Sequence, residues 1–266
     1  MDSSTSWQPI QEPTVELDVF PPQQQRRWTV LLRLILAIPQ LIVLWALGIA
    51  AAVVAIIGWF GALFTGALPQ WAGDFLRQYV AYNARVTGYL MLLVDAYPPF
   101  KLDAGVDYPV RVWFPAPTPL NRMAVLFRFF LALPILVLSS FFASGWMVIG
   151  FVVWLIVLIT GRMPGALFEA TAAVLRIQLR TESYWYMLTP TYLKQIFGDG
   201  PAPTAAAPQQ YAAASPTRPL LVSQGGRILL WVILVLGILA SIGQSVGGSV
   251  TDDDNTETVS GYSRTY

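Results

Sequence analysis

The chain has 266 residues, of which 55% are hydrophobic and only 12% are charged. Soluble domains carry about 25% charged residues, so the shortage of charge indicates a protein surrounded by lipid rather than by water. The net charge of +1, with no Cys and no His, excludes disulfides, thiolate catalysis, zinc sites with nitrogen or sulfur ligands and a basic surface for nucleic acid.

Residues 1–13 come first and are predicted to be disordered. The first 25 residues lack the basic and apolar pattern of a secretory signal, so the first apolar run is expected to remain in the mature protein.

Two short segments, residues 15–19 and 110–114, alternate between apolar and polar side chains. Alternation with period two is typical of a half-exposed strand, and the neighbouring prolines favour edge strands. Extended linkers are the alternative interpretation. Glu16 and Arg111 occupy equivalent positions in their segments, so they would form an opposite-charge pair if the two strands met.

A long apolar run follows each short segment, at residues 30–64 and 125–159, and each run contains one charge, Arg33 or Arg128. As one helix, 35 residues would be about 52 Å long, whereas the hydrocarbon of a bilayer is about 30 Å thick. A single straight crossing therefore fits the length poorly.

Two arrangements remain for each run. The favoured one is a hairpin of two short crossings, which turns near Gly48 in the first run and, in the second, near Ser139, Ser140, Ser144 and Gly145. The competing one has an interfacial helix up to Pro39 and a single crossing over residues 40–64. The apolar helices are expected within residues 29–65 and 123–160.

Each apolar run ends at a Thr-Gly pair, and Pro69 or Pro164 follows. Gly after an apolar run with Pro three residues later predicts a helix stop and a new start. The new helices, residues 69–94 and 164–188, carry Arg on an aromatic background, which is typical of the membrane interface. The candidate lipid-headgroup contacts are Arg33, Arg128, Arg77, Arg85, Arg176 and Arg180.

The two halves repeat one another at a fixed spacing of 95 residues. The matches include Arg, Pro, Trp, Gly and Tyr, which chance similarity between apolar runs does not produce. Residues 14–104 and 105–197 are therefore predicted to be tandem repeats. The matched pairs include Arg33 with Arg128, Pro39 with Pro134, Trp59 with Trp154, Gly66 with Gly161, and Tyr89 with Tyr184.

The C-terminal part differs in character. Residues 198–226 are rich in Pro, Ala and Gln and are predicted to form a flexible linker. Residues 227–247 are apolar and long enough for a transmembrane helix, and residues 248–266 are predicted to be an acidic, disordered tail. Gly237 and Ser241 would allow the helix to pack closely against another membrane protein.

The predicted fold is therefore a mostly α-helical integral membrane protein. It has two tandem repeats, each of a short strand, an apolar hairpin and an amphipathic helix, and one C-terminal transmembrane helix. Short connections would keep both strands on one side, so five crossings are expected. The positive-inside rule puts the strands and the N-terminus in the cytoplasm and the tail outside.

Three stretches carry a resemblance to a known family. Residues 97–102 (YPPFKL), 107–112 (DYPVRV) and 128–134 (RFFLALP) resemble the bacterial membrane family of domain of unknown function 4389. The resemblance covers both repeats, about residues 14–197, and implies a bacterial plasma membrane. It brings no activity, so no catalytic residue is carried over. The Asp95-Ala96-Tyr97-Pro98 sequence of the first repeat becomes Pro190-Thr191-Tyr192-Leu193 in the second.

A non-enzymatic scaffold or accessory subunit of a membrane complex is the expected function, because no catalytic motif is present. We expect no cofactor and no metal, with membrane lipids as partners. The alternative is a small transporter or lipid-handling protein with parallel repeats. A third interpretation is an interaction module that presents its strands to a cytosolic partner.

Overall fold

A computed structural model describes residues 14–103, 105, 107–192, 218 and 220–260, and for residues 245–260 only the course of the backbone. The predictions for residues 1–13, for most of the 198–226 linker and for the last six residues lie outside this part. The elements are β1 (Glu16–Val19), α1 (Arg27–Leu31), α2 (Arg33–Thr65), α3 (Gln70–Leu90), β2 (Val110–Trp113), α4 (Arg122–Leu126), α5 (Arg128–Thr160), α6 (Gly165–Trp185) and α8 (Gln224–Ser260).

The two apolar runs form single helices, α2 and α5, of 33 residues each. The predicted hairpins are therefore wrong: Gly48, Ser139, Ser140, Ser144 and Gly145 all lie inside continuous helices. A single glycine lowers helix stability by about 1 kcal/mol, which does not break a long helix that packs along a neighbour. A helix of this length is too long for the bilayer only if it crosses the bilayer straight along its own axis.

Glycine ends both long helices, as the sequence predicts. Gly66 and Gly161 adopt positive φ angles of 79° and 73°, a conformation that glycine enters without strain. Their N–H groups donate to Ala62 O and Val157 O at 2.8 Å. Pro69 and Pro164 then precede α3 and α6 directly, so each apolar helix is followed at once by its amphipathic partner.

The strands meet as a two-stranded antiparallel sheet, in which Leu17 lies opposite Val112. These two residues are 95 positions apart, so each strand pairs with its own counterpart about a local two-fold axis. The register sets Asp18 opposite Arg111. The expected Glu16–Arg111 pair is therefore wrong, because antiparallel pairing reverses the order of one strand relative to the other.

Reciprocal hydrogen bonds extend the two-fold relation to the helices. Trp59 Nε1 donates to Val125 O (2.8 Å), and its counterpart Trp154 donates to Val30 O (2.9 Å). The Gln25 N–H likewise donates to Gly161 O, and the Leu120 N–H donates to Gly66 O. The beginning of each apolar helix thus lies at the end of the other, so α2 and α5 run antiparallel.

Helix α8 breaks this symmetry, because it packs on α5 and α6 of the second repeat. A Cβ added at Gly145 would lie 1.8 Å from Ile233 O, and one at Gly237 would lie 1.8 Å from Phe141 O, so the two helix backbones are in direct contact. Gly237 therefore packs against α5 of the same chain. The helix continues to Ser260, through residues predicted to be a disordered tail, since elongating a formed helix requires no new nucleus.

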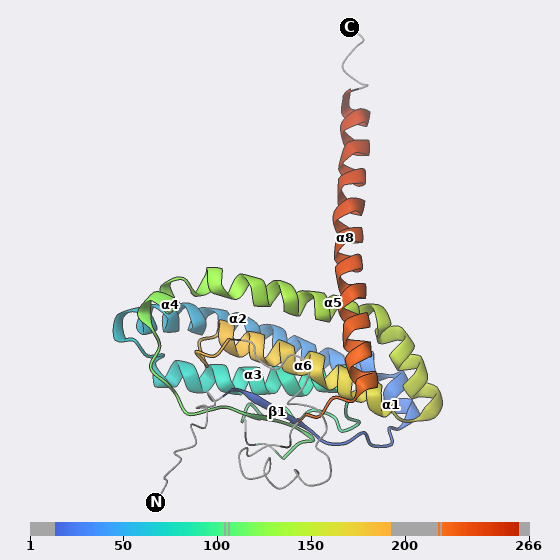
Figure 1. Cartoon of the computed structure of the whole chain (residues 1–266), viewed down its shortest axis with the longest axis horizontal. Helices are drawn as coiled ribbons and strands as arrows, with labels where there is room; N and C mark the ends of the chain where they lie inside the picture. The colour runs from blue at the N-terminus through green and yellow to red at the C-terminus, as the bar shows by residue number, and fades with distance from the viewer. Residues whose placement is uncertain (1–13, 104, 106, 193–217, 219, 261–266) are drawn as a thin grey trace, which may run out of the picture.

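Figure 1 shows α2, α3, α5 and α6 running across the view, β1 on the side away from α5, and α8 rising past α5. Three helical segments are long and apolar enough to cross a membrane: Arg33–Thr65, Arg128–Thr160 and Gln224–Gln244. Large apolar side chains are exposed along the whole of α2, among them Leu34, Ile38, Trp45, Ile49, Ile56 and Phe64. In contrast, α3 and α6 supply much of the buried core.

Candidate functional site

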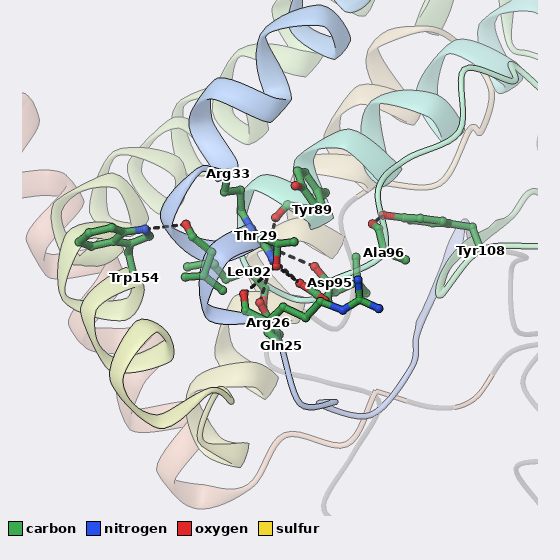
Figure 2. A network of polar contacts seen from close by, with 12 residues as sticks. Gln25, Arg26, Thr29, Arg33, Tyr89, Leu92, Asp95, Ala96, Tyr108 and Trp154 are labelled. Carbon is green, nitrogen blue, oxygen red and sulfur yellow. Dashed lines mark hydrogen bonds and ion pairs between the residues drawn. The ribbon is translucent and has the colours of Figure 1, made fainter.

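The most extensive polar network surrounds Arg33, the first residue of α2 (Figure 2). The side chain is only 2% exposed. Its Nη1 donates to Tyr89 O (2.5 Å) and Val94 O (3.0 Å), and its Nη2 donates to Gln25 Oε1 (2.9 Å). The guanidinium also lies 4.4 Å from the centre of the Tyr89 ring.

Asp95 supplies the counter-charge of this network. Its Oδ1 lies 3.5 Å from Arg33 Nη2 and accepts a hydrogen bond from Thr29 Oγ1 at 2.5 Å. Gln25 Nε2 donates to Leu92 O at 2.5 Å. The buried cation thus has both a carboxylate and neutral acceptors, which a buried charge requires.

The end of α3 explains why Arg33 lies here. The last carbonyls of a helix have no partner within it and carry partial negative charge. Leu92 has a positive φ of 62°, which turns the chain back at this point, so that its N–H donates to Tyr89 O at 3.1 Å. The Arg33 guanidinium binds the same carbonyl as a second donor. Met187, the counterpart of Leu92, has φ 61° after α6, so both repeats share this local geometry.

Other buried side chains hold the segment that follows α3. Gln40 Nε2 donates to Pro98 O at 2.6 Å, and Gln40 Oε1 accepts from the Tyr82 hydroxyl. Arg85 donates to the carbonyls of Lys101 and Asp103 at 2.6 and 2.7 Å. Burial lowers the pKa of Arg85, but an arginine remains charged, so the interaction acts as a fixed cation beneath these carbonyls.

Arg128 occupies the equivalent place in the second repeat and is 4% exposed. Its Nε donates to Tyr184 O (2.8 Å), and its Nη2 donates to Thr189 O (2.7 Å) and to Tyr184 O. The Tyr184 ring lies beneath the guanidinium, 3.9 Å from it. The side chains that complete the first network are missing here, because Gln25, Thr29 and Asp95 correspond to Leu120, Ala124 and Pro190.

A cavity of about 400 Å³ opens beside Arg128. Ile56, Trp59 and Phe60 of α2 line one side, and Phe129 and Trp185 line the other. The cavity therefore lies between the two repeats and combines apolar walls with one buried cation.

Of the six arginines predicted to contact headgroups, five are buried and one, Arg77, is partly exposed. Arg33, Arg85, Arg176 and Arg180 are at most 7% exposed. The guanidinium groups of Arg33, Arg85 and Arg180 donate to protein oxygens, including Val15 O for Arg180. Contact with bulk headgroups is wrong for these buried residues, since the fold and not the membrane surrounds them. Arg77 is partly exposed and pairs with Asp74 at 2.8 Å. Arg128 is also buried, at 4% exposed, but lines the cavity between the repeats.

Glu182 is a feature that the sequence pattern did not distinguish from surface charge. Its Oε1 accepts from Asn83 Nδ2 at 2.6 Å, across the contact between α6 and α3. Burial raises the pKa of Glu182 to about 7. No group of acidic residues that could hold a metal ion lies within the described part of the chain.

Comparison with known proteins gives a family but no activity. A model of the family described as domain of unknown function DUF4389 matches residues 27–101 and, in a second copy, residues 122–192. No curated protein and no solved structure matches the chain. The two matched segments coincide with the two halves that the local two-fold axis relates, and together they cover more than half of the sequence. The chain therefore belongs to the DUF4389 family and contains two tandem copies of its domain.

Proposed function

We propose that the protein is a non-enzymatic membrane protein, a scaffold or accessory subunit, with one crossing of the bilayer. Helix α8 forms the crossing, and the two repeats form a platform that lies along the membrane. The observation that carries this proposal is the antiparallel arrangement of α2 and α5, each of which begins where the other ends.

The connection between the repeats argues against crossings by α2 and α5. It leaves α3 near the start of α2 and reaches α4 near the end of α2, so it runs along the length of the bundle. Lys101, Asp103 and Asp107 are exposed along it. If α2 and α5 crossed the bilayer, these charges would lie within the hydrocarbon, which is strongly unfavourable.

The distribution of apolar surface supports a platform instead. Exposed apolar side chains follow the full length of α2 and α5, about 50 Å for 33 residues. The sheet and its charged connection lie on the side of the bundle away from α5, and α8 rises past α5 (Figure 1). With the two-fold axis along the membrane normal, both repeats face lipid on one side and water on the other.

This arrangement replaces the expected five crossings with one. It retains the expectation that the strands lie in the cytoplasm and the C-terminal end lies outside. Both repeats then sit at the same membrane face, which gives no basis for alternating access between two sides. In the described part of the chain, many buried polar side chains bond to backbone carbonyls of the fold, as those of Arg33 and Arg85 do, which favours a structural role over catalysis.

Single-cysteine labelling tests the arrangement, and the absence of native Cys removes background. Thr65→Cys at the end of α2, Asp107→Cys before β2 and Thr160→Cys at the end of α5 place exposed thiols. We expect a membrane-impermeant maleimide to label all three from one side, and a reporter fused after Tyr266 to lie on the other. Labelling of Thr65→Cys from the side opposite to Asp107→Cys would overturn the platform.

The scaffold role has a separate test. We expect the full chain, isolated from native membranes in mild detergent, to retain another membrane protein at a fixed molar ratio. Robust turnover of a lipid or nucleotide by the purified chain would contradict the non-enzymatic role.

A further inference from the structure

We infer that the cavity beside Arg128 binds an anionic lipid, with the acidic head against the guanidinium and the acyl chain along the apolar walls. The inference deepens the proposed function, because it names a lipid that the membrane platform holds. The two repeats contain equivalent arginine sites, and these two sites differ.

The first site is electrically complete without a ligand. Arg33 has Asp95 within 3.5 Å, and Gln25 and Thr29 bond to this pair. The structure therefore contains its own example of what a buried arginine at this position requires, namely one anion and neutral acceptors.

The second site has the cation but lacks the anion. Arg128 is 4% exposed, and no carboxylate pairs with it in the part of the chain that the structure describes. Its hydrogen bonds in that part use Nε and Nη2 and leave Nη1 without an acceptor there. A buried charge of this kind is strongly unfavourable unless a counter-charge joins it. An anion in the cavity would meet that requirement.

The cavity has the size and walls of a site for a lipid chain. Its volume of about 400 Å³ lies within the range of about 300–1,000 Å³ that small-molecule sites occupy. Trp59, Phe60 and Trp185 provide apolar walls next to the single cation. Apolar walls with one charged group recognise an amphiphile better than a small hydrophilic anion, which would leave those walls unused.

The aromatic side chains differ at the first site. The counterpart of Ile56 is Phe151, and its ring stacks on Trp154 with the ring centres 5.8 Å apart. Trp154 Nε1 donates to Val30 O, so this aromatic pair lies near the Arg33 network, whereas Ile56 and Trp59 line the cavity beside Arg128. At the first site, protein side chains therefore supply both the counter-charge, from Asp95, and the aromatic wall, from Phe151 and Trp154.

The surface around the cavity indicates that the ligand enters from the bilayer. Ile56 is 60% exposed, Phe60 is 51% exposed and Phe129 is 55% exposed. In the proposed platform these side chains face lipid, so a lipid from the same leaflet reaches Arg128 without passing through water.

The test is native mass spectrometry of the purified full chain after incubation with each of four probes. The probes are phosphatidylglycerol, oleate, phosphatidylcholine and inorganic phosphate. We expect one molecule of an anionic lipid, phosphatidylglycerol or oleate, to bind per chain. Equal retention of phosphatidylcholine would overturn the role of the charge, and binding of inorganic phosphate as tight as that of the lipids would overturn the role of the acyl chain.

Two variants connect the binding to Arg128. Pro190→Asp introduces a carboxylate where Asp95 stands in the first repeat, and Pro190→Asn is its uncharged control of equal size. We expect Pro190→Asp to lower lipid retention about tenfold, as loss of a charge-assisted interaction does, and Pro190→Asn to retain the wild-type level. Arg128→Gln should lower retention similarly. If Pro190→Asp and Pro190→Asn retain the same amount of lipid, the inference is wrong, even if Arg128→Gln fails to fold.

Cysteine labelling tests the platform and lipid retention tests the lipid site, so either proposal can be wrong while the other holds. If Thr65→Cys labels from the wrong side while the Pro190 variants differ, the platform is wrong and the lipid site stands. If the labelling agrees and the Pro190 variants do not differ, the platform stands without the lipid site.

Discussion

The arginine sites of the two repeats differ in how their charge is balanced. Arg33 and Arg128 occupy equivalent positions, and each binds the carbonyls at the end of the following helix. Only the first site has a carboxylate from the chain itself, at Asp95. Both copies have the helix-end contact, which is structural, whereas Arg33 lies beside a carboxylate and Arg128 lies beside a cavity.

The largest effect is expected from removing the cation of the complete site. Arg33→Ala leaves the partly buried Asp95 beside Thr29 without its partner and removes a donor from the carbonyls of Tyr89 and Val94. Breaking a buried pair from one side costs about 3–5 kcal/mol. We expect a loss of this size in the free energy of unfolding, measured by denaturation in detergent. A smaller loss than Arg128→Ala causes would contradict the difference between the two sites.

Asp95→Asn should have the next largest effect, because it leaves Arg33 charged without a counter-ion. Asp95 is 19% exposed, so water relieves part of the penalty, and we expect a loss of about 2–3 kcal/mol. Added anionic lipid should recover part of that stability only if the lipid reaches Arg33. Since the Phe151–Trp154 pair stands beside this site, we expect no recovery, and full recovery would show the two sites to be alike.

Gly145→Leu sharpens the second difference between the repeats, the seat of α8. The counterpart of Gly145 is Ala50, and even a Cβ at Gly145 would lie 1.8 Å from Ile233 O. We expect overpacking to cost about 1–3 kcal/mol and to free α8, seen as faster proteolysis near Gln224. Ala50→Leu is the matched control and should leave α8 docked; equal cleavage of both variants would contradict this seat.

Glu182 should produce the smallest effect, one that depends on pH. Its folded pKa of about 7 lies above the ordinary value of 4.5, so between these pH values the folded chain keeps a proton that the unfolded chain releases. The full pKa difference corresponds to about 3 kcal/mol, but the side chain is only partly buried and water screens it, so the free energy of unfolding should fall by about 1–2 kcal/mol as the pH rises from 4.5 to 7. Glu182→Gln should flatten this slope in thermal unfolding curves; an unchanged slope would assign it to other groups.

The sequence predicted the family, the duplication and the helix ends at Gly66 and Gly161, because these depend on local residue identity. It did not predict the path of the chain through the membrane, since the length of an apolar run is the same for a helix along the bilayer and one across it. The Arg33 network also escaped prediction: Gln25, Thr29 and Asp95 are ordinary polar residues until the turn at Leu92 brings them together. The cavity depends on how the two repeats pack together, and the hydrophobic periodicity of the sequence carries no information about that packing.

The depth of α2 in the bilayer tests the platform most directly. Spin labels on single cysteines at Leu34, Trp45, Ile56 and Phe64, all at least 60% exposed, sample the helix from end to end in reconstituted membranes. We expect similar accessibility to oxygen and similar protection from a water-soluble relaxation agent at all four positions. A profile that is shallow at Leu34 and Phe64 and deepest at Trp45 would mean that α2 crosses the bilayer, and would contradict the platform.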